Sequence, residues 1–300
     1  MISKKYGFDI VRCLDCGLVS VSPLPTKEQL AAYYKWEYDH FRHSFSTPQA
    51  EPPKRKLPEL RILERYCPPG KLLDVGSSHG HFIDNAHKYG WDVEGVEPHD
   101  EARIQSQSRS QHTVHELLSE APDNSFDALT MWHVIEHISA PTDFLTEATR
   151  KLVPGGILAL ATPNVDSLVA KATGESWSWL SPPDHLYLYS PKTLPLLLHQ
   201  TGFEVLHIET RRGRSRNFLL LMLQAVVYRL GLFQKVKGSV QKAAHKFRAS
   251  QSNVGKISIF FIVEKLTEAL SLLLYPAILI TWKLGLGEEV LAIARKSGTP

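Results

Sequence analysis

Two carboxylates and a turn of small residues have the types and spacing of a nucleotide-binding site. Asp74 opens a segment that continues through Gly76, Ser78 and Gly80. Glycines in such a turn let the backbone approach a ligand closely. Glu97 ends the next apolar run, and a carboxylate there can accept hydrogen bonds from both hydroxyls of a ribose. The pattern therefore predicts a ribose-containing ligand between Asp74 and Glu97.

The same turn lacks the spacing of two other nucleotide-binding loops. A dinucleotide fingerprint needs Gly-x-Gly-x-x-Gly before a helix. Here Ser78 and His81 stand at its second and third glycine positions. The Gly-Lys-Ser/Thr ending of a P-loop is also absent from this turn. An NAD-dependent oxidoreductase is therefore disfavoured.

Alternating strands and helices must position these residues. Apolar runs predict strands over 71–75, 91–97, 125–132, 156–164, 203–210 and 288–295, and helical spacing predicts helices over 81–89 and 136–152. Alternation of this kind predicts a doubly wound α/β sheet with helices on both faces. The carboxyl ends of its strands then bring Asp74 and Glu97 to one edge.

From about Lys71 to Arg211, and again at Glu289–Lys296, the chain resembles class I S-adenosylmethionine (SAM)-dependent methyltransferases. The acid and glycines after the first strand carry the resemblance, with Ser78 where the family has its middle glycine. The segments MWHVIEHI and LVPGGILALATPN closely resemble the ubiquinone-type and related small-molecule methyltransferases. The resemblance implies a seven-stranded Rossmann-like sheet, with its last strand antiparallel, and SAM as cofactor.

The resemblance also implies roles for single residues. Asp74 and the loop amides face the methionine part of SAM, and Trp132 and His133 lie beside the cofactor at a strand end. Either His115 or Glu116 must then meet the adenine amino group. Trp132 can equally be a core aromatic.

Two histidines are candidates for acid–base chemistry. An acceptor oxygen loses a proton as it attacks the methyl carbon, and a histidine with a near-neutral pKa suits that role. His185 is the first candidate base because it follows Asp184 in a Pro-bounded loop, where we expect an exposed side chain. His137 is the second. The alternatives are that His185 orders its loop, that His137 caps a helix, and that positioning alone suffices for catalysis.

A pair of cysteines precedes the predicted domain. Cys13 and Cys16 resemble the second half of a zinc ribbon found in one methyltransferase subgroup. A structural zinc site needs four ligands, and the chain before Cys13 offers neither cysteine nor histidine. We therefore expect no bound metal. With only three cysteines and no signal-peptide pattern, we expect a cytoplasmic protein.

The predicted organisation has five parts, of which the fourth is unusual. They are a truncated ribbon-like segment (1–47), a linker and helix (48–70), the SAM-binding core (71–210), a helical insert (211–286) and a last strand with tail (287–300). From Thr210 to Val263 there are eleven Lys or Arg and no Asp or Glu. Apolar runs surround these cations, and the longest is shorter than a membrane span. This pattern predicts helices on an anionic membrane surface. A helical subdomain or dimer contact is the alternative, and no nucleic acid is expected.

These observations favour methyl transfer from SAM to a small-molecule or lipid-linked acceptor, with O-methylation preferred. The alternative is a non-catalytic module of the same fold that recruits a partner at the membrane surface.

Overall fold

The computed structural model describes residues 2–34, 55–110, 112–211 and 275–298. The chain divides into two compact units. The first comprises Met1–Pro163, Ser181–Glu209 and Val290–Pro300, and the second comprises Asn164–Leu180 and Thr210–Glu289. Most of the predicted insert, residues 212–274, lies outside the described residues.

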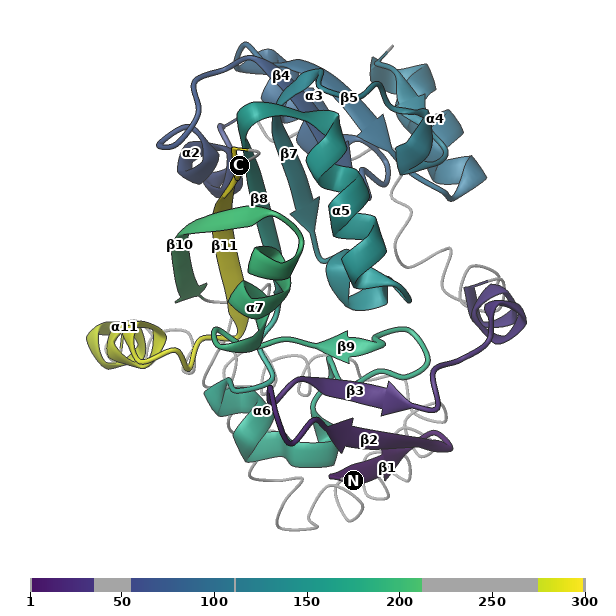
Figure 1. Ribbon diagram of the computed structural model, residues 1–300, viewed down its shortest axis with the longest axis vertical. Helices are drawn as coiled ribbons and strands as arrows, with labels where there is room; N and C mark the ends of the chain where they lie inside the picture. Colours follow the sequence, from purple (N-terminus) through teal and green to yellow (C-terminus); the bar gives the residue numbers. More distant parts are fainter. Residues whose placement is uncertain (1, 35–54, 111, 212–274, 299–300) are drawn as a thin grey trace, which may run out of the picture. The chain divides into compact units, whose positions relative to one another are not determined.

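A seven-stranded sheet forms the main framework, in the order β10-β11-β8-β7-β4-β5-β6 (Figure 1). Its strands are β4 (Lys71–Val75), β5 (Asp92–Val96), β6 (Val114–His115), β7 (Phe126–Trp132), β8 (Leu152–Pro163), β10 (Phe203–Arg211) and β11 (Glu289–Lys296). The pairs β4–β5, β4–β7, β5–β6 and β7–β8 are parallel. The predicted seven-stranded α/β sheet is thus confirmed.

The strand order reverses beside β4. The chain moves outward from β4 through β5 to β6 and then returns to β7, on the other side of β4. At such a reversal the connections leave the two neighbouring strands in opposite directions, and the crevice outside their carboxyl ends is where open α/β sheets bind their ligands. The residues after β4, β5 and β7 are therefore brought to one edge.

Burial on both faces explains why the central strands are nearly continuous apolar runs. Leu72 and Leu73 are adjacent in β4 and therefore point to opposite faces of the sheet, yet both are 0% exposed. Leu129 in β7 and Leu158 in β8 are also fully buried. A parallel strand covered on both faces has this composition.

The helices of the first unit include α2 (Pro58–Leu63), α3 (His81–Lys88), α4 (Asp100–Ser110), α5 (Pro141–Lys151) and α7 (Thr193–Gln200). The predicted helix over 136–152 was wrong at its start, because α5 begins at Pro141. Proline favours the first turn of a helix and disfavours a helical residue before it. Glu136 and His137 instead belong to a separate 3-10 turn, Ile135–His137.

A small antiparallel sheet contains the first strands of the chain. It consists of β1 (Ser3–Lys5), β2 (Phe8–Arg12), β3 (Val19–Ser22) and β9 (Tyr187–Leu188), in that order. In the pairing of β3 with β9, Val19 lies opposite Leu188. Residues near the start of the chain are thus paired with the segment that follows His185.

The second unit contains α6 (Leu168–Thr173) and α11 (Tyr275–Lys283) among its described residues. Asn164 Nδ2 donates to the carbonyls of Gly285 and Gly287, at 2.9 and 2.7 Å. Across the described ranges, no helix has the length and apolarity needed to span a bilayer.

Candidate functional site

The turn after β4 has the backbone conformation that its glycines predict. Gly76, Ser78 and Gly80 have φ of 75°, 49° and 78°, all in the left-handed region. A Cβ at Gly76 would lie 2.5 Å from Val134, and a Cβ at Gly80 would collide with Ser106. Space and backbone both require glycine at these two positions, whereas Ser78 accepts the left-handed conformation with a side chain.

Glu97 connects this turn to the end of β5. Its side chain is buried, and Oε2 accepts a hydrogen bond from the Ser78 amide at 2.8 Å. Oε1 accepts one from the His99 amide at 2.9 Å. A carboxylate oxygen can accept a second hydrogen bond, so both oxygens keep capacity for a ribose hydroxyl. The structure thus brings the predicted residues Ser78 and Glu97 together.

Asp74 lies buried near the carboxyl end of β4. Thr130 of β7 donates a hydrogen bond to its Oδ1 at 2.6 Å. Burial raises the pKa of Asp74 to about 7; the Thr130 hydrogen bond opposes this rise, and the charge of Glu97 adds to it. A buried carboxylate of this kind favours a cationic partner, which would restore its charged form.

The two candidates for adenine recognition lie in different surroundings. His115 Nε2 lies 2.7 Å from Glu94 Oε2. Glu116 is 54% exposed in its side chain and lies 3.4 Å from Arg103. Arg103 also donates to the backbone carbonyl of Glu97 at 3.0 Å, so Glu116 shares the Glu97 edge of the sheet. Arg103 was not identified from the sequence. The only feature that could have indicated it was its place as a cation in the helix that follows Glu97.

The end of β7 presents Trp132 and His133. The Trp132 ring packs edge-on against Phe82, with centroids 5.5 Å apart. His133 has φ of 59°, an uncommon conformation for a residue with a side chain, and its amide donates to Ala161 at 2.8 Å. Strained backbone of this kind clusters at functional sites. Here it turns the chain sharply toward Glu136.

Glu136 is a fully buried carboxylate. Its Oε2 accepts a hydrogen bond from Thr162 at 2.9 Å, and its Oε1 lies 3.4 Å from His133 Nδ1. Burial alone would raise the pKa of Glu136, but its contact with His133 and the nearby charges of His137 and His185 outweigh burial and lower that pKa. The site therefore holds a buried negative charge beside histidines.

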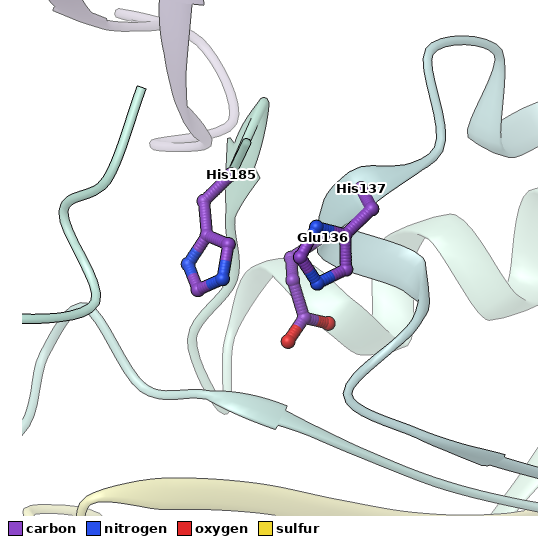
Figure 2. A group of neighbouring side chains, drawn as sticks. All are labelled: Glu136, His137 and His185. Carbon is purple, nitrogen blue, oxygen red and sulfur yellow. The ribbon is translucent and has the colours of Figure 1, made fainter. Parts of the chain in front are cut away.

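His137, Asp184 and His185 complete this cluster, part of which Figure 2 shows. His137 Nδ1 lies 2.8 Å from Asp184 Oδ1. The two histidine rings meet edge to face, with centroids 4.7 Å apart. Both predicted candidate bases are therefore in one place, supplied by the turn after β7 and by the loop before β9.

His185 is not the exposed side chain that its loop predicted, since it is only 6% exposed. The reason is that both backbone groups of the next residue, Leu186, form hydrogen bonds that hold the loop against neighbouring segments. The Leu186 amide donates to the backbone carbonyl of Glu136 at 2.8 Å, and the Leu186 carbonyl accepts from the Val21 amide of β3 at 3.0 Å. His137 is more accessible, with 27% of its side chain exposed.

Metal binding has two candidate places in the described chain. One ligand atom each from Glu136, His137 and His185 lie within 4.8 Å of one another. Side chains held in this arrangement could either transfer a proton or bind a metal ion. A measurement of metal content distinguishes these two uses. Cys13 and Cys16 are both exposed, near the turn between β2 and β3. The absence of metal at either place stays a prediction.

A family model described as "Methyltransferase domain" matches residues 33–208. Among curated proteins, the chain is 28% identical over 151 residues to a ubiquinone biosynthesis O-methyltransferase of Maricaulis maris, covering 45% of this chain and 59% of that protein. It is 30% identical over 100 residues to the protein of that name from Paramagnetospirillum magneticum, covering 31% and 40%. The matches thus span less than two thirds of these relatives.

Solved structures share the fold at low identity. The [4+2]-cyclase SpnF superimposes with a TM-score of 0.54 at 18% identity, covering 92% of this chain and 99% of that one. A Burkholderia thailandensis 1,6-didemethyltoxoflavin-N1-methyltransferase, solved with S-adenosylhomocysteine, gives a TM-score of 0.51 at 12% identity, covering 95% and 98%. These likenesses support the fold alone, and the two titles name different reactions.

Proposed function

Because the chain belongs to the methyltransferase domain family, we propose that it transfers a methyl group from SAM to a hydroxyl oxygen of a small-molecule acceptor. The observation that carries the proposal is the pairing of His137 with Asp184 beside the buried carboxylate Glu136. A hydroxyl acceptor must lose its proton, and this cluster offers an oriented histidine to receive it.

The proposed cofactor site uses the turn after β4. Asp74 pairs with the ammonium of the methionine part, because a buried carboxylate gains most from a cation. Glu97 accepts hydrogen bonds from the ribose hydroxyls, and Ser78 shapes the loop through its backbone. Trp132 and His133 border the sulfonium at the end of β7. Glu116 is the preferred candidate for the adenine amino group, because His115 already lies 2.7 Å from Glu94.

The proposed reaction is a single displacement. The acceptor oxygen forms a bond to the methyl carbon while the carbon–sulfur bond breaks, and the electron pair of that bond stays on sulfur to give S-adenosylhomocysteine. The acceptor proton passes to the histidine cluster. Alignment of the two reactants supplies a large share of the rate enhancement.

The relatives favour oxygen as the acceptor atom, since their printed names include O-methyltransferase. The same names assign those relatives to ubiquinone biosynthesis; a lipid-linked acceptor for this chain rests on its basic insert alone. We test the acceptor with a panel in which phenols and alcohols are matched by amines of similar shape.

The first experiment measures SAM binding and turnover separately. Titration calorimetry gives affinities for SAM and S-adenosylhomocysteine, and release of S-adenosylhomocysteine reports turnover with each acceptor. Turnover confined to hydroxyl acceptors supports O-methylation. Turnover confined to amines, or binding without any turnover across the panel, would contradict it.

A non-catalytic module is the second candidate. One observation favours it: the side chain of Glu116, the candidate for the adenine amino group, is 54% exposed and lies 3.4 Å from Arg103. Such a module would recruit a partner at the membrane surface through its basic segment. It is distinguished by SAM affinity that is weak or absent together with retained binding to anionic vesicles.

A further inference from the structure

We propose that Asp184 is a positioning residue that forms a histidine–aspartate dyad with His137 and makes His137 the proton acceptor of methyl transfer. The inference rests on the proposed function and deepens it, because it selects one of two candidate histidines and states what the Asp184 carboxylate does for it.

Both partners of His137 Nδ1 are acceptors. The Asp184 carboxylate lies 2.8 Å away and the Asp184 backbone carbonyl 3.2 Å away. A carbonyl oxygen cannot donate a hydrogen bond, so Nδ1 must carry the proton. The neutral ring then has its lone pair on Nε2, which is the form that a general base needs.

Asp184 is itself held in place by segments from elsewhere in the chain. The side chain of Tyr34 forms a hydrogen bond with it. Two residues further on, the Leu186 amide donates to the backbone carbonyl of Glu136, and the Leu186 carbonyl accepts from the Val21 amide. The Asp184 side chain is 15% exposed, so little water competes for its oxygens. Orientation fixed in this way allows one carboxylate to select the tautomer of its partner.

The surrounding charges support a proton on His137 after transfer. Asp184 and Glu136 both face the ring, and His185 lies against it. Burial acts to lower the pKa of His137, but the hydrogen bond and charge of Asp184, with the charge of Glu136, outweigh burial and raise it. Burial acts to raise the pKa of Asp184, and its contacts with His137, His185 and Tyr34 lower it overall.

His185 takes a different part in this arrangement. Its Nε2 lies 3.7 Å from Asp184 Oδ2, beyond hydrogen-bond distance, and its side chain is far less exposed than that of His137. Its ring stands at 82° to the His137 ring. His185 thus packs against the His137 ring and restricts its rotation. The proton of the acceptor goes to His137 Nε2.

The test compares Asp184→Asn, Asp184→Glu and His137→Gln with Asp143→Asn, a control at an exposed acid in the first turn of α5. We expect His137→Gln and Asp184→Asn to lower kcat by about 10²- to 10⁴-fold while SAM affinity stays within about twofold. Asp184→Glu should recover part of the loss, because a carboxylate can still accept from Nδ1. The control should match the wild type.

A second readout does not depend on turnover. In the SAH-bound chain labelled with ¹⁵N-histidine, the His137 ring should show a protonated Nδ1 and should titrate at lower pH in Asp184→Asn than in the wild type. Wild-type turnover that fails for every acceptor counts against the proposed function, whereas the ring spectrum still decides the dyad.

Three results would overturn the dyad. They are a His137 ring that titrates identically in the wild type and Asp184→Asn, an Nε2-protonated tautomer, and one tightly bound divalent metal per chain whose removal abolishes turnover. Thermal melting of each variant with bound SAH checks that the fold is kept. If Asp184→Asn fails to fold, the tautomer of the wild-type ring alone supports or contradicts the proposal.

Discussion

At the scale of single residues, the buried carboxylates Asp74 and Glu97 have different tasks. Asp74 accepts a hydrogen bond from a side chain, Thr130, whereas Glu97 accepts from two backbone amides. Burial is the main cause that raises the pKa of Asp74 to about 7. Asp74 therefore responds to pH near neutrality, whereas we expect Glu97 to contribute to the affinity for SAM.

Replacing Glu97 should weaken SAM binding without preventing it. Glu97→Ala removes charge-assisted hydrogen bonds to two hydroxyls and also frees the Ser78 amide, so we expect a loss of about 1.5–3 kcal/mol. Titration calorimetry measures it, with the exposed Glu204→Ala as the matched control. Equal affinities for the two variants would remove Glu97 from the cofactor site.

The affinity for SAM should rise as the pH increases through about 7. Binding to an ammonium requires the charged form of Asp74, which loses its proton near that pH. Affinity at pH 6 should therefore be about tenfold weaker than at pH 8. The Asp74→Asn variant should bind more weakly and with a flatter pH dependence. A wild-type affinity that is constant from pH 6 to 8 would contradict this linkage.

The sign for stability is opposite in the ligand-free chain. The folded-state pKa of Asp74 lies above its ordinary value in an unfolded chain, so its contribution favours folding below about pH 4 and is lost as the pH rises through about 7. SAM should offset this loss by pairing with the carboxylate. Thermal shifts on adding SAM should therefore be larger at pH 8 than at pH 6.

At the scale of elements, the β3–β9 pairing supports the loop that carries Asp184 and His185. The Val21 amide donates to Leu186 at 3.0 Å. Val21→Pro removes this donor, whereas Val21→Ala keeps it. We expect Val21→Pro to lower kcat by at least about tenfold, because small misplacements of catalytic groups are costly.

Both Val21 variants should leave the affinity for SAM unchanged, because the proposed cofactor site lies at the ends of β4 and β5. Calorimetry and steady-state kinetics on the two variants measure both quantities. Parallel losses of SAM affinity and kcat would indicate general unfolding. Equal kcat for Val21→Pro and Val21→Ala would show that the pairing does not support the site.

The elements also show how far sequence reasoning reaches. Asp74, Ser78 and Glu97 were predicted together because the ends of adjacent parallel strands meet by rule. The start of α5 was wrong because apolar spacing continues through residues 136–140, while Pro141 decides where the helix begins.

Burial of His185 and its partner Asp184 could not be predicted in this way. Their positions depend on β9 pairing with β3, a strand from the start of the chain. A pattern read along the chain indicates whether a segment forms a strand, but not which distant strand it pairs with. The contact of His137 with Asp184 follows from that pairing, so it emerges only from the three-dimensional structure.

At the scale of the whole molecule, the basic segment from Thr210 to Val263 is unlike the rest of the chain. Its eleven cations and lack of acids predict attraction to anionic lipid, and each cation near the surface can contribute about 1 kcal/mol at moderate salt. Residues 212–274 lie outside the described residues, so this prediction rests on the sequence.

Co-sedimentation with vesicles tests the membrane prediction. The chain should bind anionic vesicles at low salt, bind neutral vesicles poorly and detach at high salt. A variant in which residues 211–286 are replaced by a short linker should lose vesicle binding and keep its SAM affinity. Absence of binding to anionic vesicles at low salt would contradict the prediction and favour a helical subdomain or dimer contact.

The place of β11 in the sheet affects how the chain matures on the ribosome. β11 lies between β10 and β8, yet it is the last of the described strands to be translated. Until residues 289–296 emerge, β8 and β10 each expose an unpaired edge, and such edges attract other chains. The sheet therefore closes only near the end of synthesis, and nascent chains stalled before β11 should depend on chaperones to stay soluble.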